Sequence, residues 1–588
     1  MVQGFVQIAI LCAALVAAMP LLGGYMARVF RNERVFLTPV VGPLERITYK
    51  LLRVDPFRGQ DWKAYAKTLL IFSALFWLAL YLILRTQTLH PFNPQDFHSG
   101  TWDVSFNTVS SFITNTNWQY YGGETTMSYF SQMAGLAVQN FVSAAVGIVV
   151  VVALIRAIAV RRGMTEGTAS LGNFWQDLVR TTFYILLPIS IVGALLLVSQ
   201  GVLQNFSGYV HFTGPSGGSG LIGMGPVASQ EIIKELGTNG GGFFNVNSAM
   251  PFENATGLSN FIELFAILVI PVALTWTFGR MVGSRRQGLA IFAAMAVVFI
   301  VGVVVVYVAE QHGTPAQHAA GVHTHAFDGS TGGNMEGKDQ RFGIANSALW
   351  TAVTTVTSCG AVNAAFESLT GIGSLVPFAN LSLSETIFGG VGAGLYGMLM
   401  FVLLAVFLGG LMVGRTPEYL GKKIAPREIK LVALAAFFTP FVTLFSSSVA
   451  LATDYGKPSI YASGPQGFSE TMYAYLSQAN NNGSALAGYT GYYQPAPGNV
   501  GAHGITFADV VGGLTMLSAR FIPILAVLAV AGSLARKTAT PSGLGTMRTD
   551  TPTFVVLLIG TVVLVGALTF FPALLLGPIV QGLTNHLF

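Results

Sequence analysis

Thr238-Asn239-Gly240-Gly241 decides the fold, because this stretch has three counterparts along the chain. They are Thr114-Asn115-Thr116-Asn117, Thr357-Ser358-Cys359-Gly360 and Asn480-Asn481-Asn482-Gly483. The first residues of successive motifs lie 124, 119 and 123 positions apart. Such even spacing predicts one structural unit copied four times. Because the motifs are small, uncharged and rich in oxygen, we expect the four copies to surround a polar axis with carbonyl and hydroxyl oxygens.

Composition places these motifs in a membrane protein. The chain has 588 residues, of which 52% are hydrophobic and 9% charged, and its mean hydropathy is +0.61. Soluble domains carry about 25% charged residues, so the composition excludes an ordinary soluble protein. Apolar runs of spanning length predict an all-α polytopic fold with ten transmembrane helices, near residues 5–30, 64–86, 127–155, 178–201, 257–280, 288–310, 391–414, 429–452, 506–534 and 553–580.

Basic residues orient the ten segments. Five clusters hold 24 of the 30 Lys and Arg residues, and all five fall on one side of the ten-helix arrangement. The positive-inside rule makes that side cytoplasmic, so all four motifs and both termini are expected on the outer side of a bacterial inner membrane. The first segment has no Lys or Arg before it and many after it, a pattern typical of a retained helix rather than a cleaved signal.

Each motif follows a short segment that cannot span a bilayer. These segments are 106–113, 229–237, 346–356 and 468–479, and they predict re-entrant helices, because irregular backbone at membrane depth must be packed in protein or line a wet cavity. The repeating plan is helix, short helix, motif, helix. Within a single membrane domain, it predicts a first helix with a basic segment at 1–63, repeats at 64–165, 174–283, 287–415 and 428–536, and a last helix at 550–588.

The motif residues suit a dehydrated monovalent cation. Glycines at 240, 241, 360 and 483 allow backbone angles that turn successive carbonyls toward one axis. The short helices would direct their partially negative C-terminal ends toward the same axis. No Asp or Glu lies within the motifs, which disfavours divalent selectivity, since Ca²⁺ sites recruit carboxylates. We therefore predict an ion pore or binding filter.

Longer strings resemble the KdpA family, the channel-like subunits of the bacterial Kdp potassium-pumping P-type ATPase. The strings are Thr238-Asn239-Gly240-Gly241-Gly242-Phe243-Phe244-Asn245, Asn334-Met335-Glu336-Gly337-Lys338, Thr357-Ser358-Cys359-Gly360-Ala361-Val362, Phe388-Gly389-Gly390-Val391-Gly392, Gly394-Leu395-Tyr396-Gly397-Met398, Gly414-Arg415-Thr416-Pro417-Glu418-Tyr419-Leu420-Gly421-Lys422-Lys423 and Asn480-Asn481-Asn482-Gly483-Ser484-Ala485. The resemblance covers nearly the whole chain.

The resemblance implies several properties that the residues alone do not establish. It implies potassium as the ion bound at all four motifs, in the fold of the superfamily of potassium transporters. It also implies a P-type ATPase catalytic subunit that binds ATP, with small accessory membrane subunits as further partners. Finally, it implies that the seventh spanning helix is broken near Gly389, Gly390, Gly392 and Gly394. These glycines serve as a gate or constriction on one interpretation and as close packing sites on the other.

Four further features stand out, and three of them have an alternative interpretation. Gln119 shapes the outer mouth or is an ordinary buried amide, and Arg520, inside the ninth spanning segment, lines the ion path or makes a buried structural pair. Lys234 and Glu235 are expected to form an ion pair at the outer mouth. The His-rich loop 311–341 is interpreted as a solvated loop rather than a metal site.

The chain has no phosphate-binding loop and no Asp-Lys-Thr-Gly motif. The predicted function is therefore a non-hydrolysing, potassium-selective subunit that receives extracellular potassium and passes it to an ATP-hydrolysing partner, with no organic cofactor. An autonomous channel or a potential-driven potassium transporter is the alternative, and the discriminating observation is whether uptake needs the partner and ATP. A membrane-embedded enzyme and an inverted-repeat transporter are disfavoured, because the spanning segments hold few acid–base groups and the repeats are parallel.

Overall fold

The computed structural model describes residues 1–159, 170–326, 332–384, 386–491, 507–539 and 546–583. Parts of several predictions lie outside these residues: the end of repeat 64–165, residues 327–331 and 385 of repeat 287–415, residues 492–506 of repeat 428–536, the centre of the loop 311–341 and the end of the segment 550–588. Within the described residues, ten helices are long and apolar enough to cross a membrane. Each corresponds to one of the ten predicted segments, so the all-α polytopic fold is confirmed.

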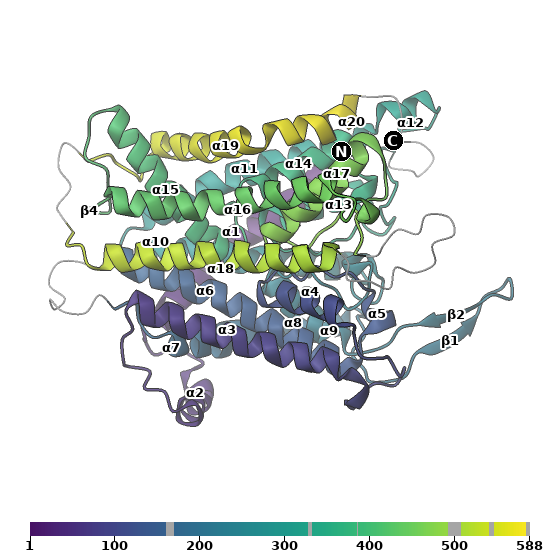
Figure 1. Ribbon diagram of the computed structural model, residues 1–588, viewed down its shortest axis with the longest axis horizontal. Helices are drawn as coiled ribbons and strands as arrows, with labels where there is room; N and C mark the ends of the chain where they lie inside the picture. Colours follow the sequence, from purple (N-terminus) through teal and green to yellow (C-terminus); the bar gives the residue numbers. More distant parts are fainter. Residues whose placement is uncertain (160–169, 327–331, 385, 492–506, 540–545, 584–588) are drawn as a thin grey trace.

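The spanning elements lie side by side along the long axis of the molecule (Figure 1). In chain order they are α1 (Val2–Phe30), α3 (Trp62–Arg85), η2 (Ser131–Ala137) continued by α6 (Val138–Ala159), α7 (Phe174–Arg180) continued through η3 (Thr181–Leu186) to α8 (Leu187–Ser199), α10 (Gly257–Met281), α11 (Arg285–His312), α15 (Ala393–Met412), α16 (Pro426–Ala452), α18 (Phe507–Ala535), and α19 (Pro552–Leu574) continued through η7 (Leu575–Ile579) to α20 (Val580–Leu583).

Burial sorts these helices into inner and outer ones. The most apolar windows of the α6, α10 and α15 spans are 83%, 78% and 72% buried, whereas those of α1, α3 and the α19 span are 22%, 28% and 33% buried. The exposed faces of the outer helices carry Leu, Ile, Val and Phe side chains. In a membrane these faces meet hydrocarbon, and apolar helices buried on all sides belong to the centre of a large bundle.

Four short helices lie in one half of the molecule (Figure 1). They are α4 (Trp102–Ile113), α9 (Val227–Leu236), α13 (Gly343–Val356) and α17 (Gly464–Ala479). All four coincide with the predicted re-entrant segments, and most begin several residues earlier than predicted. At 10 to 16 residues none reaches the roughly 20 residues that a bilayer requires.

The third repeat departs from the predicted plan. After the third motif the chain forms α14 (Gly371–Ser382), then ten residues outside any helix (383–392, of which 385 is not described), and only then α15. The predicted spanning segment 391–414 missed α14. Gly389, Gly390 and Gly392 lie in this irregular segment, while Gly394 lies inside α15. The break therefore precedes the long helix, and Gly392 has φ +91°, a value that favours glycine.

Smaller elements mark the two ends of the bundle. The helix α2 (Thr38–Leu52) and the pair β3 (Glu418–Tyr419) and β4 (Lys422–Lys423) lie at one end, which carries the basic clusters. The hairpin of β1 (Val210–Thr213) and β2 (Ser219–Ile222), the N-terminus and the helices α5 (Gly123–Thr126) and α12 (Pro315–Ala319) lie at the opposite end (Figure 1). The four motifs belong to the half of the molecule nearer the hairpin.

Candidate functional site: a fourfold ring of backbone carbonyls

The four motifs share one backbone conformation, which fixes their register. The short helices end so that the C-caps are Thr114, Gly237, Thr357 and Asn480. Two residues after each cap, a backbone N–H donates to the carbonyl five residues earlier, over 2.9–3.0 Å. We call the residue that donates this hydrogen bond position 3 of its motif, and the residue after it position 4. Position 3 is Thr116, Asn239, Cys359 and Asn482, and position 4 is Asn117, Gly240, Gly360 and Gly483.

This register corrects the alignment drawn from the sequence. Thr238 was paired with Thr114 and Thr357 as the first residue of its motif, but its structural equivalents are Asn115, Ser358 and Asn481. All four have φ between +48° and +74°. The second motif therefore begins at Gly237, which the sequence analysis left out, and Gly241 lies one residue beyond position 4.

The position 3 carbonyls converge beside Gly240. A Cβ atom added to Gly240 would lie 2.3 Å from the Asn482 oxygen, 2.6 Å from that of Thr116 and 2.9 Å from that of Cys359. Position 4 glycines of the other motifs are equally enclosed, since a Cβ on Gly360 would be 2.0 Å from the Asn482 oxygen and one on Gly483 would be 2.2 Å from the Thr116 oxygen. Carbonyls from different repeats thus meet around one axis, which we call the motif ring.

Hydrogen bonds join all four neighbouring pairs of motifs. The Asn115 amide donates to the Thr238 carbonyl at 2.8 Å, and the Asn481 amide donates to the Thr116 hydroxyl at 3.0 Å. The Asn482 amide donates to the carbonyl of Thr354, in the helix that precedes the third motif, at 2.8 Å. The Cys359 thiol lies 3.4 Å from the Asn239 carbonyl. These bonds run right round the ring and help to hold its carbonyls in place.

The motif ring forms the floor of an outer cavity of about 630 Å³. All four position 4 residues line this cavity. Gln119 lies in its wall, where its amide donates to the Gly242 carbonyl at 3.3 Å and its oxygen accepts from the Gly242 N–H at 3.0 Å. Gln119 therefore links the segment after the first motif to Gly242, which lies just after the second.

The irregular segment 383–392 lies against the opposite side of the ring. The Val391 N–H donates to the Thr238 hydroxyl at 2.8 Å. A Cβ on Gly392 would be 2.2 Å from the carbonyl of Gly147, in α6, and a Cβ on Gly147 would be 3.4 Å from the Arg520 guanidinium. The Arg520 side chain, 4% exposed, thus lies close to this segment. A small cavity of about 40 Å³ reaches Asn480 and Asn481 from this side.

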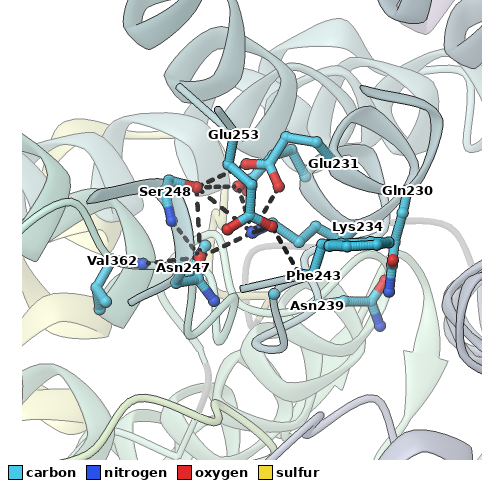
Figure 2. A network of polar contacts seen from close by, with 12 residues as sticks. Gln230, Glu231, Lys234, Asn239, Phe243, Asn247, Ser248, Glu253 and Val362 are labelled. Atoms are coloured by element: carbon cyan, nitrogen blue, oxygen red, sulfur yellow. Dashed lines mark hydrogen bonds and ion pairs between the residues drawn. The ribbon is translucent and has the colours of Figure 1, made fainter. Parts of the chain in front are cut away.

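A charged network lies behind the second motif (Figure 2). Lys234 is fully buried, with Nζ 2.8 Å from a Glu231 oxygen and 3.7 Å from Glu235. The predicted ion pair at the outer mouth is therefore wrong in its location: both residues are in the core. Lys234 also donates to Asn247 Oδ1 at 2.7 Å, and Asn247 Nδ2 donates to the Gly240 carbonyl at 3.1 Å. The network reaches the motif ring through Asn247.

Sequence reasoning missed Gly237, Asn247 and two of the carboxylates around Lys234, those of Glu231 and Glu253. The helix C-cap could have indicated Gly237, since glycine is common at helix ends. No local pattern indicated Asn247, because its contact with Gly240 depends on the turn between them. The His-rich loop contributes the short helix α12, and His318 lies 2.9 Å from the His312 carbonyl.

The fold and the ring together define a class: a multi-pass helical membrane protein in which four short helices end in motifs of one backbone conformation around a carbonyl-lined centre. Such a ring suits a partly dehydrated monovalent cation, because neutral oxygens replace water without trapping the ion.

The chain belongs to the KdpA family, described as "Potassium-transporting ATPase A subunit", whose profile matches residues 9–583. It is 52% identical over 591 residues to the potassium-transporting ATPase potassium-binding subunit of Sorangium cellulosum, covering 99% of both chains. It is also 50% identical over 604 residues to the subunit of that name in Koribacter versatilis (99% of both chains) and 51% identical over 582 residues to that of Rhodospirillum centenum (99% of this chain, 98% of the relative).

Proposed function

We propose that the chain is the potassium-selective, channel-like subunit of an ATP-driven potassium pump. Extracellular potassium binds at the motif ring and passes to a P-type ATPase partner, which binds and hydrolyses ATP. The observation that carries the proposal is the convergence of the Thr116, Cys359 and Asn482 carbonyls beside Gly240. The relatives' shared name, which assigns them potassium binding within a potassium-transporting ATPase, supports the choice of ion.

The chemistry of the ring favours potassium over divalent ions. The position 3 and position 4 residues contribute backbone carbonyls, hydroxyls and amides but no carboxylate. Ca²⁺ typically recruits carboxylate ligands, and Mg²⁺ gives up its water reluctantly. Hydrogen bonds between the motifs hold the ring at one size. Such a ring can favour an ion whose hydration shell its oxygens reproduce. The C-terminal ends of the four short helices add partial negative charge.

Orientation follows from the basic clusters. With those clusters facing the cytoplasm, the outer cavity of about 630 Å³ faces the outside of the bacterial inner membrane, and both termini lie on that side. Potassium enters this cavity, passes the ring and meets the segment 383–392 on the inner side. We propose that this segment, which contacts Thr238 through Val391 and α6 through Gly392, restricts passage below the ring. Small accessory membrane subunits complete the complex.

Uptake into proteoliposomes tests the proposal. The chain is reconstituted alone or with its membrane partners, with and without ATP, and potassium uptake is measured. The proposal predicts uptake only when partners and ATP are both present. Passive potassium flux through the chain alone would support the autonomous channel instead. Omission of ATP provides the matched control.

A further inference from the structure

Four carboxylates and one ammonium group are buried together behind the second motif. Glu231 and Glu235 lie on α9, Glu253 follows the motif, and Glu263 lies on α10; each is 0% exposed, as is Lys234. If all are ionised, four negative charges face one positive charge. Buried charges require compensation, so the contacts of each carboxylate decide what this cluster binds.

Three of the carboxylates have donors within the chain. Glu231 accepts from the Ser248 hydroxyl at 2.6 Å and pairs with Lys234 at 2.8 Å. Glu253 accepts from the Phe243 N–H at 2.6 Å. Glu235 faces the Cys359 thiol, whose sulfur lies 3.4 Å from its carboxylate. Figure 2 shows Glu231, Glu253, Ser248 and Asn247 arranged around the Lys234 ammonium.

Glu263 differs from the other three. Neither of its carboxylate oxygens has a hydrogen-bond partner in the described part of the chain, although the side chain is completely buried. It approaches from a separate helix and places an oxygen within 4.8 Å of oxygens of Glu231 and Glu235. Like charges this close repel strongly in a dry interior. An ionised Glu263 therefore needs a positive charge that the described residues do not supply.

We propose that Glu231, Glu235 and Glu263 hold a resident divalent cation of the Ca²⁺ type, separate from the transported potassium. Carboxylate oxygens are the ligands that such hard cations prefer, and Ca²⁺ bonds of about 2.3–2.6 Å place opposite ligands about 5 Å apart. The spacing within 4.8 Å fits that span. With both oxygens available, Glu263 can bind bidentately. A divalent ion also reduces the excess negative charge of the cluster from three to one.

The site joins α9 to α10 and supports the motif ring from behind. Glu235 contacts the thiol of Cys359, and the same sulfur lies 3.4 Å from the Asn239 carbonyl. A cation that fixes Glu235 therefore also restrains two position 3 residues. The cation contributes rigidity and takes no part in transport. The inference does not depend on the proposed function, because a resident ion is measured without transport.

Metal content of the intact complex tests the inference. The complex is purified in millimolar CaCl₂, transferred to metal-free buffer and analysed by mass spectrometry for bound metals. We expect about one Ca²⁺ per chain in the wild type and a loss of most of it in Glu263→Gln. The matched control is Glu253→Gln, which removes one charge from the same network but leaves the three ligands, and it should retain the metal.

Thermal unfolding of the wild-type complex, with and without Ca²⁺, supplies a second readout. Ca²⁺ should raise the melting temperature of the wild-type complex relative to a chelator, because an ion that binds only the folded state stabilises it, and Glu263→Gln should abolish the shift. A wild-type complex without bound divalent metal and without a Ca²⁺-dependent shift would overturn the inference and assign a proton to Glu263. Equal metal loss in Glu253→Gln would overturn the choice of ligands.

Discussion

At the residue scale, the position 4 glycines determine how closely the four repeats approach. Gly360 has φ +90°, and a Cβ there would lie 2.0 Å from the Asn482 oxygen. Both conditions exclude other residues: a left-handed conformation costs an L-residue about 1–2 kcal/mol, and the clash involves backbone that cannot rotate away. Asn117 occupies the same position in the first motif with φ +55°, a conformation that asparagine tolerates better than most residues.

Gly360→Ala should therefore disturb ion binding. We expect the motif ring to widen and the apparent potassium affinity of ATP-driven uptake to fall by about tenfold or more, since each 1.4 kcal/mol is a factor of ten. Discrimination against sodium and rubidium should fall as well. Uptake assays at varied ion concentrations measure both quantities. Gly257→Ala is the control, because a Cβ there meets nothing within 4 Å; an unchanged affinity in Gly360→Ala would remove this residue from the ring.

Glu470 makes stability depend on pH. Burial, together with the nearby Glu367 carboxylate, raises the pKa of Glu470 to about 7 from its ordinary 4.5. Between these values the folded chain holds a proton that the unfolded chain has lost, so stability should fall as the pH rises through this window. Glu470→Gln keeps an oxygen for the Tyr461 and Ala462 N–H groups and should flatten the dependence.

Melting temperatures at pH 5 and pH 8 check this expectation. The wild type should lose more stability than Glu470→Gln over that interval, while Glu33→Gln, at an exposed glutamate, should follow the wild type. Identical slopes in wild type and Glu470→Gln would show that another group carries the proton.

The limits of sequence-based prediction are clearest for single residues. Spacing and residue type located all four motifs, but they aligned Thr238 with Thr114 and Thr357 because all three are threonines. The true equivalence depends on the hydrogen bond from the Asn239 N–H to the Lys234 carbonyl. The residue types in the sequence give no indication of this bond. Likewise, Glu231 and Glu263 are 32 positions apart, and only the packing of α9 against α10 brings them together.

At the element scale, a hydrogen bond joins the segment 383–392 to the motif ring. Its Val391 N–H donates to the Thr238 hydroxyl. Hydropathy predicted the helix around 391–414 but missed the short α14 before it, because the break depends on glycines that allow close contact with α6. The ten spans, by contrast, followed from length and apolar content alone, since backbone groups in lipid must be satisfied within helices.

Thr238→Val should loosen this segment. The variant has nearly the same shape but leaves the Val391 N–H without its acceptor, at a cost of about 1–3 kcal/mol for a buried donor. We expect faster hydrogen exchange in peptides that cover residues 386–392 and an altered uptake rate. Thr238→Ser retains the hydroxyl and should behave like the wild type. Unchanged protection in Thr238→Val would mean that other contacts hold the segment.

Lys422 connects the C-terminal ends of α6 and α18. Its ammonium donates to the carbonyls of Ala157, in the last turn of α6, and of Leu534, in the last turn of α18, each at 2.7 Å. Cations stabilise helix C-termini, whose carbonyls lack partners within the helix.

Lys422→Met should therefore lower the free energy of unfolding by about 1–3 kcal/mol. Thermal unfolding in detergent measures the effect, with the exposed Lys423→Met as the control. Equal melting temperatures for the two variants would contradict the role assigned to Lys422.

At the scale of the whole molecule, four short helices and their motifs place one carbonyl-lined ring between the cavity of about 630 Å³ and the irregular segment 383–392. Inner helices buried on all sides hold the short helices in place, and outer helices present apolar faces to lipid. Membership of the KdpA family assigns this architecture to a potassium-transporting ATPase. We propose that this chain selects the ion and that a partner hydrolyses ATP. The first part of this proposal depends on the converging carbonyls of the motif ring.

The most direct test is to locate the ion. The intact complex is prepared in thallium, a heavy potassium analogue, and its position is determined by anomalous diffraction. The account predicts a peak on the axis of the motif ring, within coordination distance of the position 3 carbonyls of Thr116, Asn239, Cys359 and Asn482, and weakening of that peak in Gly360→Ala. A ring without thallium in a complex that transports it, or a sole peak elsewhere in the chain, would contradict the central claim.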